Sequence, residues 1–297
     1  MKTKLLALVI ALLLILPTFI FFLGDKMFTF HDETQIANLH QYFKSLDFGQ
    51  FPPRWAPDMH FEYGSPFLSF NYQLPYYLGY LGHLAGLPLT AIFKFLMAFS
   101  VIIGAIGMFR LAVFLTGSNF VALFAAVLYS YTPFQAVDHY VRGTLGESFA
   151  LALFPWLFLS LFALTKKVTT TKIIFAGLLF GLLLTTHQPA ALFALPLFFT
   201  IFALPALFTK QFGILIALAK ALVLASLFSA FYVLPVLFEK QFIVANSPFN
   251  FQDHFPFIRQ LIYSSWSYSG SNPFSTDTMS FQIGLVNLAI LAAAVVF

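Results

Sequence analysis

The feature that most constrains this chain is a series of long apolar segments separated by short polar breaks. A helix needs roughly 20 apolar residues to cross a bilayer, and most of these segments are about that long. They cover residues 5–23, 89–114, 119–137, 146–165, 172–187, 190–208, 212–238 and a last stretch from about 284. We therefore predict an all-α fold, a polytopic membrane protein with about seven to eight transmembrane helices.

Composition excludes a soluble domain, because hydrophobic residues make up 60% of the 297 positions and charged residues only 9%. Soluble domains carry roughly 25% charged residues. The absence of cysteine excludes disulfides, thiolate nucleophiles and Cys-ligated metals. We expect residues 1–297 to form a single transmembrane module. Because the last apolar segment stops after about 14 residues at Phe297, shorter than a span requires, we also expect the natural chain to continue.

The distribution of charge predicts an orientation. With the N-terminus in the cytoplasm, the inner turns carry eight Lys or Arg residues and no acid, and the outer segments carry all eleven acids with the other seven bases. This satisfies the positive-inside rule. It divides the net charge of +4 into +8 inside and −4 outside, so the basic balance reflects topology and gives no reason to expect nucleic acid.

Three outer segments, at about 24–75, 136–147 and 239–283, hold nearly all residues capable of chemistry. In the first, His31, Asp32 and Glu33 precede a pattern of apolar residues at helical spacing. We predict an interfacial helix there. Asp32 fits an N-cap with Gln35 completing a capping box; alternatively, Asp32 or Glu33 serves as a general base, and Asp32 as a metal ligand.

Farther along the same loop, Arg54 and Trp55 follow Pro52 and Pro53. Two prolines hold the backbone extended, so one reading is an aromatic loop at the membrane interface. The other is a substrate-binding pair, since a guanidinium binds phosphate well. Residues 66–87 are apolar, and we expect them to lie flat or to re-enter the membrane.

The second outer segment contains four ionisable residues between two apolar segments, namely Asp138, His139, Arg142 and Glu147. Charges so close to lipid usually face a cavity or a partner. They can form ion pairs that pin two helix ends, since Asp138 and Arg142 are four residues apart. They can also act on a substrate: Asp138 and Glu147 would help a first-loop acid, Asp32 and Asp138 could share a cation such as Mg²⁺ or Mn²⁺, and His139 and Arg142 would bind substrate.

His187 stands at an outer turn between two apolar segments, on the face that carries the acids. A lone His among apolar residues is more often a hydrogen-bonded structural group than a catalyst. We keep the alternative that it binds substrate. The chain has no P-loop, dinucleotide fingerprint, HExxH or GxSxG motif.

The pattern resembles the membrane module of GT-C glycosyltransferases. It resembles more closely a bacterial branch of polytopic proteins described as a "6-pyruvoyl-tetrahydropterin synthase related" membrane domain. The matching residues are Asp32, Gly49, Pro53-Arg54-Trp55, Tyr63-Gly64-Ser65-Pro66, Tyr76-Tyr77, Arg142-Gly143, Glu147 and Thr186-His187. The pterin description implies a zinc enzyme with a His triad, and because the sequence has no such triad we set that chemistry aside.

The GT-C resemblance implies a first-loop acid as base or metal ligand, here Asp32 or Glu33, assisted by Asp138 or Glu147. It also implies a polyprenyl-phosphate-linked sugar as donor. We therefore expect a multi-pass membrane glycosyltransferase whose partners are the lipid-linked donor and membrane lipids, acting at the outer face. Two alternatives remain, a transporter or flippase of lipid-linked glycans and a non-catalytic membrane scaffold.

Overall fold

The protein was analysed as a computed structural model, which describes residues 2–243, 251–268 and 279–296. Within these ranges the regular structure is helical, and the only strand-like feature is one isolated bridge between Ala56 and Ser65. The prediction of an all-α chain is confirmed. Part of the third outer segment, including Asp277, lies outside the described residues. Phe297, beyond which we expected the natural chain to continue, also lies outside them.

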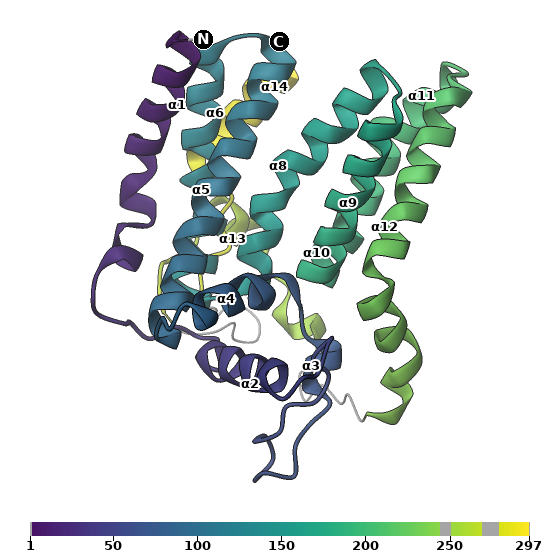
Figure 1. Cartoon of the computed structure of the whole chain (residues 1–297). Helices are drawn as coiled ribbons and strands as arrows, with labels where there is room; N and C mark the ends of the chain where they lie inside the picture. Colours follow the sequence, from purple (N-terminus) through teal and green to yellow (C-terminus); the bar gives the residue numbers. More distant parts are fainter. Residues whose placement is uncertain (1, 244–250, 269–278, 297) are drawn as a thin grey trace.

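Long apolar helices form the body of the molecule and run side by side (Figure 1). They are α1 (Lys2–Ile15), α5 (Leu89–Thr116), α6 (Asn119–Ser130), α8 (Leu145–Lys166), α9 (Thr170–Thr186), α10 (Gln188–Phe198) continued by η4 (Phe199–Ala203) and α11 (Leu204–Phe208), α12 (Phe212–Glu239) and α14 (Leu285–Val296). Among the described residues, four helical stretches are long and apolar enough to cross a membrane. A fifth is added if α6 and the bent segment after it form one span. Three more apolar helices, in α1, α9 and α14, are shorter than that.

Two predicted spans are broken at prolines. The first apolar segment continues past α1 only as short turns, η1 (Leu16–Thr18) and η2 (Ile20–Leu23), because Pro17 lacks the N–H that a continuing helix needs. The segment predicted at 119–137 ends as α6 at Ser130, bends by 45° and resumes at Pro133. The residue before a proline is disfavoured in a helix, which explains the break at Thr132.

Small residues allow the long helices to pack closely, as expected for apolar spans. A Cβ on Gly107 of α5 would lie 2.6 Å from the Trp156 ring of α8. On α9, a Cβ on Gly177 would lie 2.9 Å from the backbone oxygen of Ala221 in α12. At both positions a larger residue would force the two helices apart.

One end of the bundle is closed by α2 (Gln35–Asp47), α3 (Phe67–Phe70) and α4 (Leu74–Leu84), which lie across the long helices (Figure 1). The turns that join α5 to α6, α8 to α9 and α11 to α12 lie at the other end. These turns contain only basic charges, Lys166, Lys167 and Lys210. The two ends of the bundle therefore differ in charge, as the sequence predicted.

The polar face of α2, which begins within the segment predicted to form an interfacial helix, is buried. Gln35, Asn38 and Gln41 are each no more than 6% exposed. Gln35 Oε1 accepts hydrogen bonds from the hydroxyls of Tyr72 and Tyr76, the latter at 3.4 Å. The capping box is also absent: α2 has Thr34 at its N-cap, and the Gln35 side chain is committed to the tyrosines. Buried amides need partners, and Tyr72 and Tyr76 provide them for Gln35.

The edge of α2 is held by exposed carboxylates. Asp58 accepts hydrogen bonds from Lys44 Nζ at 2.6 Å and from Gln41 Nε2 at 2.9 Å, and these lower the pKa of its carboxyl group. Asp47 accepts from the Tyr80 hydroxyl at 2.8 Å, which lowers its pKa as well. The Asp58 contacts hold the loop after α2 against that helix, and the Asp47 contact holds α2 against α4.

Candidate functional site

The core of the candidate site is Asp138, whose side chain is completely buried. It lies in the π-helix η3 (Val137–Arg142), which follows the short α7 (Pro133–Ala136). Irregular π turns within helices frequently occur at functional sites. Gly143 ends this turn with φ of 70°, and its N–H donates to the Asp138 carbonyl at 2.9 Å.

The Asp138 carboxylate is surrounded by donors. The Thr144 hydroxyl donates to Oδ1, and the Ser148 hydroxyl donates to Oδ2 at 3.2 Å. Arg142 Nη1 donates to Oδ1 at 3.2 Å and also to Glu147 Oε2. Arg142 therefore bridges two carboxylates, one buried and one 19% exposed. The ion pairs that the sequence offers as one alternative are present, and the Arg142 side chain is 28% exposed.

The first outer loop is joined to this segment through its backbone. The N–H of His31 donates to the Val141 carbonyl at 2.7 Å, and the N–H of Asp32 donates to the Arg142 carbonyl at 2.8 Å. Asp32 is about one-third exposed, and its carboxylate lies 3.2 Å from Nδ1 of His31. The two backbone bonds therefore hold the loop that carries Asp32 against the segment that carries Arg142.

His187, in the turn between α9 and α10, completes the group that we call the Arg142 cluster. Its other members are Asp32, Asp138, Arg142 and Glu147. The pKa of His187 is lowered, mainly by burial and also by the charge of Arg142, against the opposing effect of Glu147. Its Nδ1 is buried and has no hydrogen-bond partner in the described part of the chain. A neutral imidazole with a buried, unpaired nitrogen can bind a ligand group at this position.

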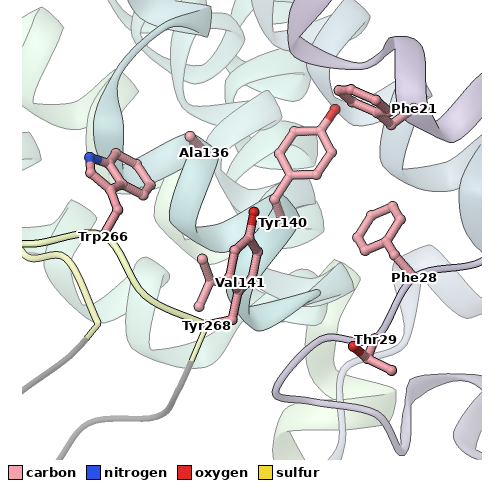
Figure 2. Close-up of a pocket in the computed structure, with 8 residues that line it drawn as sticks. All are labelled: Phe21, Phe28, Thr29, Ala136, Tyr140, Val141, Trp266 and Tyr268. Atoms are coloured by element: carbon pink, nitrogen blue, oxygen red, sulfur yellow. The ribbon is translucent and has the colours of Figure 1, made fainter.

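A cavity of about 610 Å³ adjoins the cluster. Figure 2 shows rings from η2 and the loop after it on one side, and Trp266 and Tyr268 on the other, with η3 between them. It is lined by Phe21, Phe28, Thr29, Ala136, Tyr140, Val141, Trp266 and Tyr268. The walls are largely apolar and aromatic. Val141 belongs to both places, since its side chain lines the cavity and its carbonyl binds His31.

The remaining predicted residues lie apart from the Arg142 cluster or face away from it. Arg54 Nη1 pairs with Glu239 at the end of α12, at 3.1 Å. Trp55 packs over Gly64, where a Cβ would lie 2.1 Å from its indole nitrogen. The His139 ring is buried, with Nδ1 2.6 Å from the Gln135 carbonyl. Glu33 is exposed. Their predicted substrate or catalytic roles stay predictions.

A divalent cation does not fit the donor set at Asp138. Both oxygens of this carboxylate already accept hydrogen bonds, and Arg142 occupies the position between it and Glu147. Within residues 2–243, 251–268 and 279–296, no group of three or more His, Asp or Glu side chains could hold a metal ion.

Three residues that contribute contacts to the candidate site were not predicted from the sequence. Thr144 and Ser148 are four residues apart at the start of α8, so both hydroxyls face Asp138. That spacing was a readable signal beside a buried acid. Tyr72 contacts Gly146, where a Cβ would lie 2.6 Å from its ring. No local sequence pattern predicts this contact, because it joins α8 to a distant segment that precedes α4.

The chain matches one known family of membrane proteins. A family model described as "6-pyruvoyl-tetrahydropterin synthase related domain; membrane protein" matches residues 69–294. The chain belongs to this family of membrane proteins. The match includes η3, α8 and His187 and begins after Asp32. No curated protein and no solved structure matches the chain.

Gly143 lies against Phe30 of the first loop, and its replacement gives a test of that junction. A Cβ on Gly143 would lie 2.3 Å from the Phe30 ring. We expect Gly143→Ala to displace Phe30 and to cost about 1 to 3 kcal/mol of unfolding free energy beyond the backbone strain. Gly117→Ala is the matched control, since Gly117 has φ of 73° and nothing within 4 Å. Thermal unfolding in detergent compares the two, and equal losses would contradict the close contact.

Proposed function

We propose that this chain is a membrane glycosyltransferase of the GT-C type. It transfers a sugar from a polyprenyl-phosphate-linked donor to an acceptor at the membrane face that carries α2, α3 and α4. In this proposal all eight apolar helices cross the membrane. The N-terminus is cytoplasmic, and the acid-bearing loops are outside the cytoplasm.

One observation carries the proposal: backbone bonds join His31 and Asp32 to Val141 and Arg142, and Val141 lines an apolar cavity. A lipid-linked sugar phosphate needs both environments. Its hydrocarbon chain requires an apolar groove, and its phosphate requires a cation. The aromatic walls suit the first requirement and the partly exposed Arg142 the second.

The reaction then follows from the positions of the charges. The acceptor hydroxyl gives its proton to the Asp32 carboxylate, and its oxygen attacks the anomeric carbon of the donor. The bond between that carbon and the phosphate oxygen breaks, and the departing polyprenyl phosphate takes up the electron pair. Arg142 stabilises the charge that develops on this phosphate. Asp138 and Glu147 hold the guanidinium in place, and His187 contributes a hydrogen bond to the ligand.

The direct test uses the purified full chain reconstituted in liposomes. A set of polyprenyl-phosphate sugars, each radiolabelled in the sugar, is supplied together with a membrane extract that contains acceptors. We expect label to move from the lipid to an acceptor and polyprenyl phosphate to accumulate in equal amount. Movement of the intact donor across the bilayer without transfer would support a flippase, and neither event with any donor would contradict the proposal.

A further inference from the structure

A second groove lies at the opposite end of the bundle from the Arg142 cluster. It has a volume of about 320 Å³ and is bounded by the end of α8, by η4 and α11, and by the start of α12. Its apolar wall includes Phe162, Ile201 and Ile214, and its polar rim includes Thr165, Lys166 and Gln211. The groove is therefore amphipathic along its length. None of the residues that line it takes part in the proposed reaction.

The wall has a structural cause. Pro205 has no N–H to donate to the Ile201 carbonyl four residues earlier, so the helix cannot continue with regular α bonds. The chain between α10 and α11 winds instead as the π-helix η4. A π turn widens a helix locally and re-aims its side chains. Ile201, on this turn, is 40% exposed and lines the groove.

The rim carries an ammonium group that no acid neutralises. Lys166 is the last residue of α8, and its Nζ lies 4.1 Å from the centre of the Phe114 ring. Within the described chain, no carboxylate pairs with it. Lys172, six residues later, differs: its Nζ donates to the carbonyls of Ala163 and Lys167. Of these two lysines, Lys166 is the one that lines the groove.

We propose that this groove binds an anionic phospholipid. One acyl chain lies along Phe162, Ile201 and Ile214, and the phosphate contacts the Lys166 ammonium and the Gln211 side-chain amide. The groove lies at the end of a candidate span, the depth at which a headgroup meets its chains. The surrounding turns are basic and contain no acid. A zwitterionic lipid should bind more weakly there, because the cation in its own headgroup is repelled by the basic turns.

The test is a native mass spectrometry titration of the full chain in non-ionic detergent. Dioleoyl phosphatidylglycerol is compared with dioleoyl phosphatidylcholine. We expect phosphatidylglycerol to bind more tightly, and Lys166→Gln to weaken it about fivefold, the effect of one basic residue near an anionic lipid. Lys172→Gln should leave the affinity unchanged. Equal binding of the two lipids, or equal losses in the two variants, would overturn the proposal.

The apolar wall is tested separately. Ile201→Trp fills the groove and should reduce phosphatidylglycerol binding, whereas Phe199→Trp should not, because Phe199 is 54% exposed on the same π-helix without lining the groove. Glycerol phosphate at the same concentration should fail to displace the lipid. If it competes equally, the site binds a free anion and the lipid proposal is wrong. Circular dichroism melting confirms that each variant is folded.

Discussion

Asp32→Asn should reduce the rate of sugar transfer by about 10²- to 10⁴-fold, the range expected when a general base is removed. The substitution keeps the size of the side chain and leaves intact the backbone bond from Asp32 to the Arg142 carbonyl. An amide cannot take the acceptor proton. Since the donor's phosphate and lipid chain contact other residues in our proposal, donor binding should change by less than about twofold.

Glu33→Gln is the matched control for Asp32→Asn. Glu33 is the adjacent carboxylate and is exposed, whereas Asp32 is joined to the Arg142 cluster. We expect this variant to retain transfer activity. Single-turnover assays with preloaded donor separate the chemical step from binding. If Glu33→Gln loses as much activity as Asp32→Asn, the choice between the two acids is wrong. If neither variant is impaired, neither of these acids is the base, and the proposed reaction is wrong.

The helices of this protein could be predicted from the sequence because lipid imposes a simple rule. Apolar segments must satisfy their backbone internally, so length and hydropathy locate them. The positions where a helix breaks inside an apolar segment were harder to predict. Pro17 and Pro133 stand inside apolar runs, and the sequence shows the prolines without showing whether a span tolerates them or ends there. In both places the helix ends.

The polar face of α2 shows where hydropathy fails. Gln35, Asn38 and Gln41 repeat at helical spacing, and a helix with such a face normally exposes it. Here the face is covered by tyrosines from the chain around α4, which donate hydrogen bonds to Gln35. Whether an amide faces water or a buried partner depends on a segment more than 30 residues away. The amphipathic pattern alone contains no information about that segment.

The candidate site was partly predictable for a similar reason. The topology predicted from the charges places Asp32, Asp138 and His187 on one face of the membrane. The finer choice among neighbours required the structure. His139 is adjacent to Asp138 in sequence but faces Gln135, and Arg54 meets Glu239. Adjacent residues on a turn point in different directions, so sequence proximity could not distinguish them.

Arg142→Met should lower the free energy of unfolding by about 3 to 5 kcal/mol, the cost of removing one partner from a buried ion pair. The reason is the position of Asp138. Its side chain has no exposed surface. Burial and the charge of Glu147 raise the pKa of Asp138, and removing the guanidinium takes away the charge that opposes both effects. Thr144 and Ser148 still donate hydrogen bonds, but hydroxyl dipoles do not replace a full positive charge.

Arg54→Met is the control, because the Arg54–Glu239 pair has a similar distance of 3.1 Å but side chains 49% and 39% exposed. Exposed pairs contribute about 0 to 1 kcal/mol, so this variant should be nearly neutral. Adding Asp138→Asn to Arg142→Met removes the unpaired charge and should recover much of the lost stability. Denaturation in mixed micelles measures all four proteins. Equal costs for the two arginines, or no recovery in the double variant, would mean that burial of Asp138 does not determine the stability of this cluster.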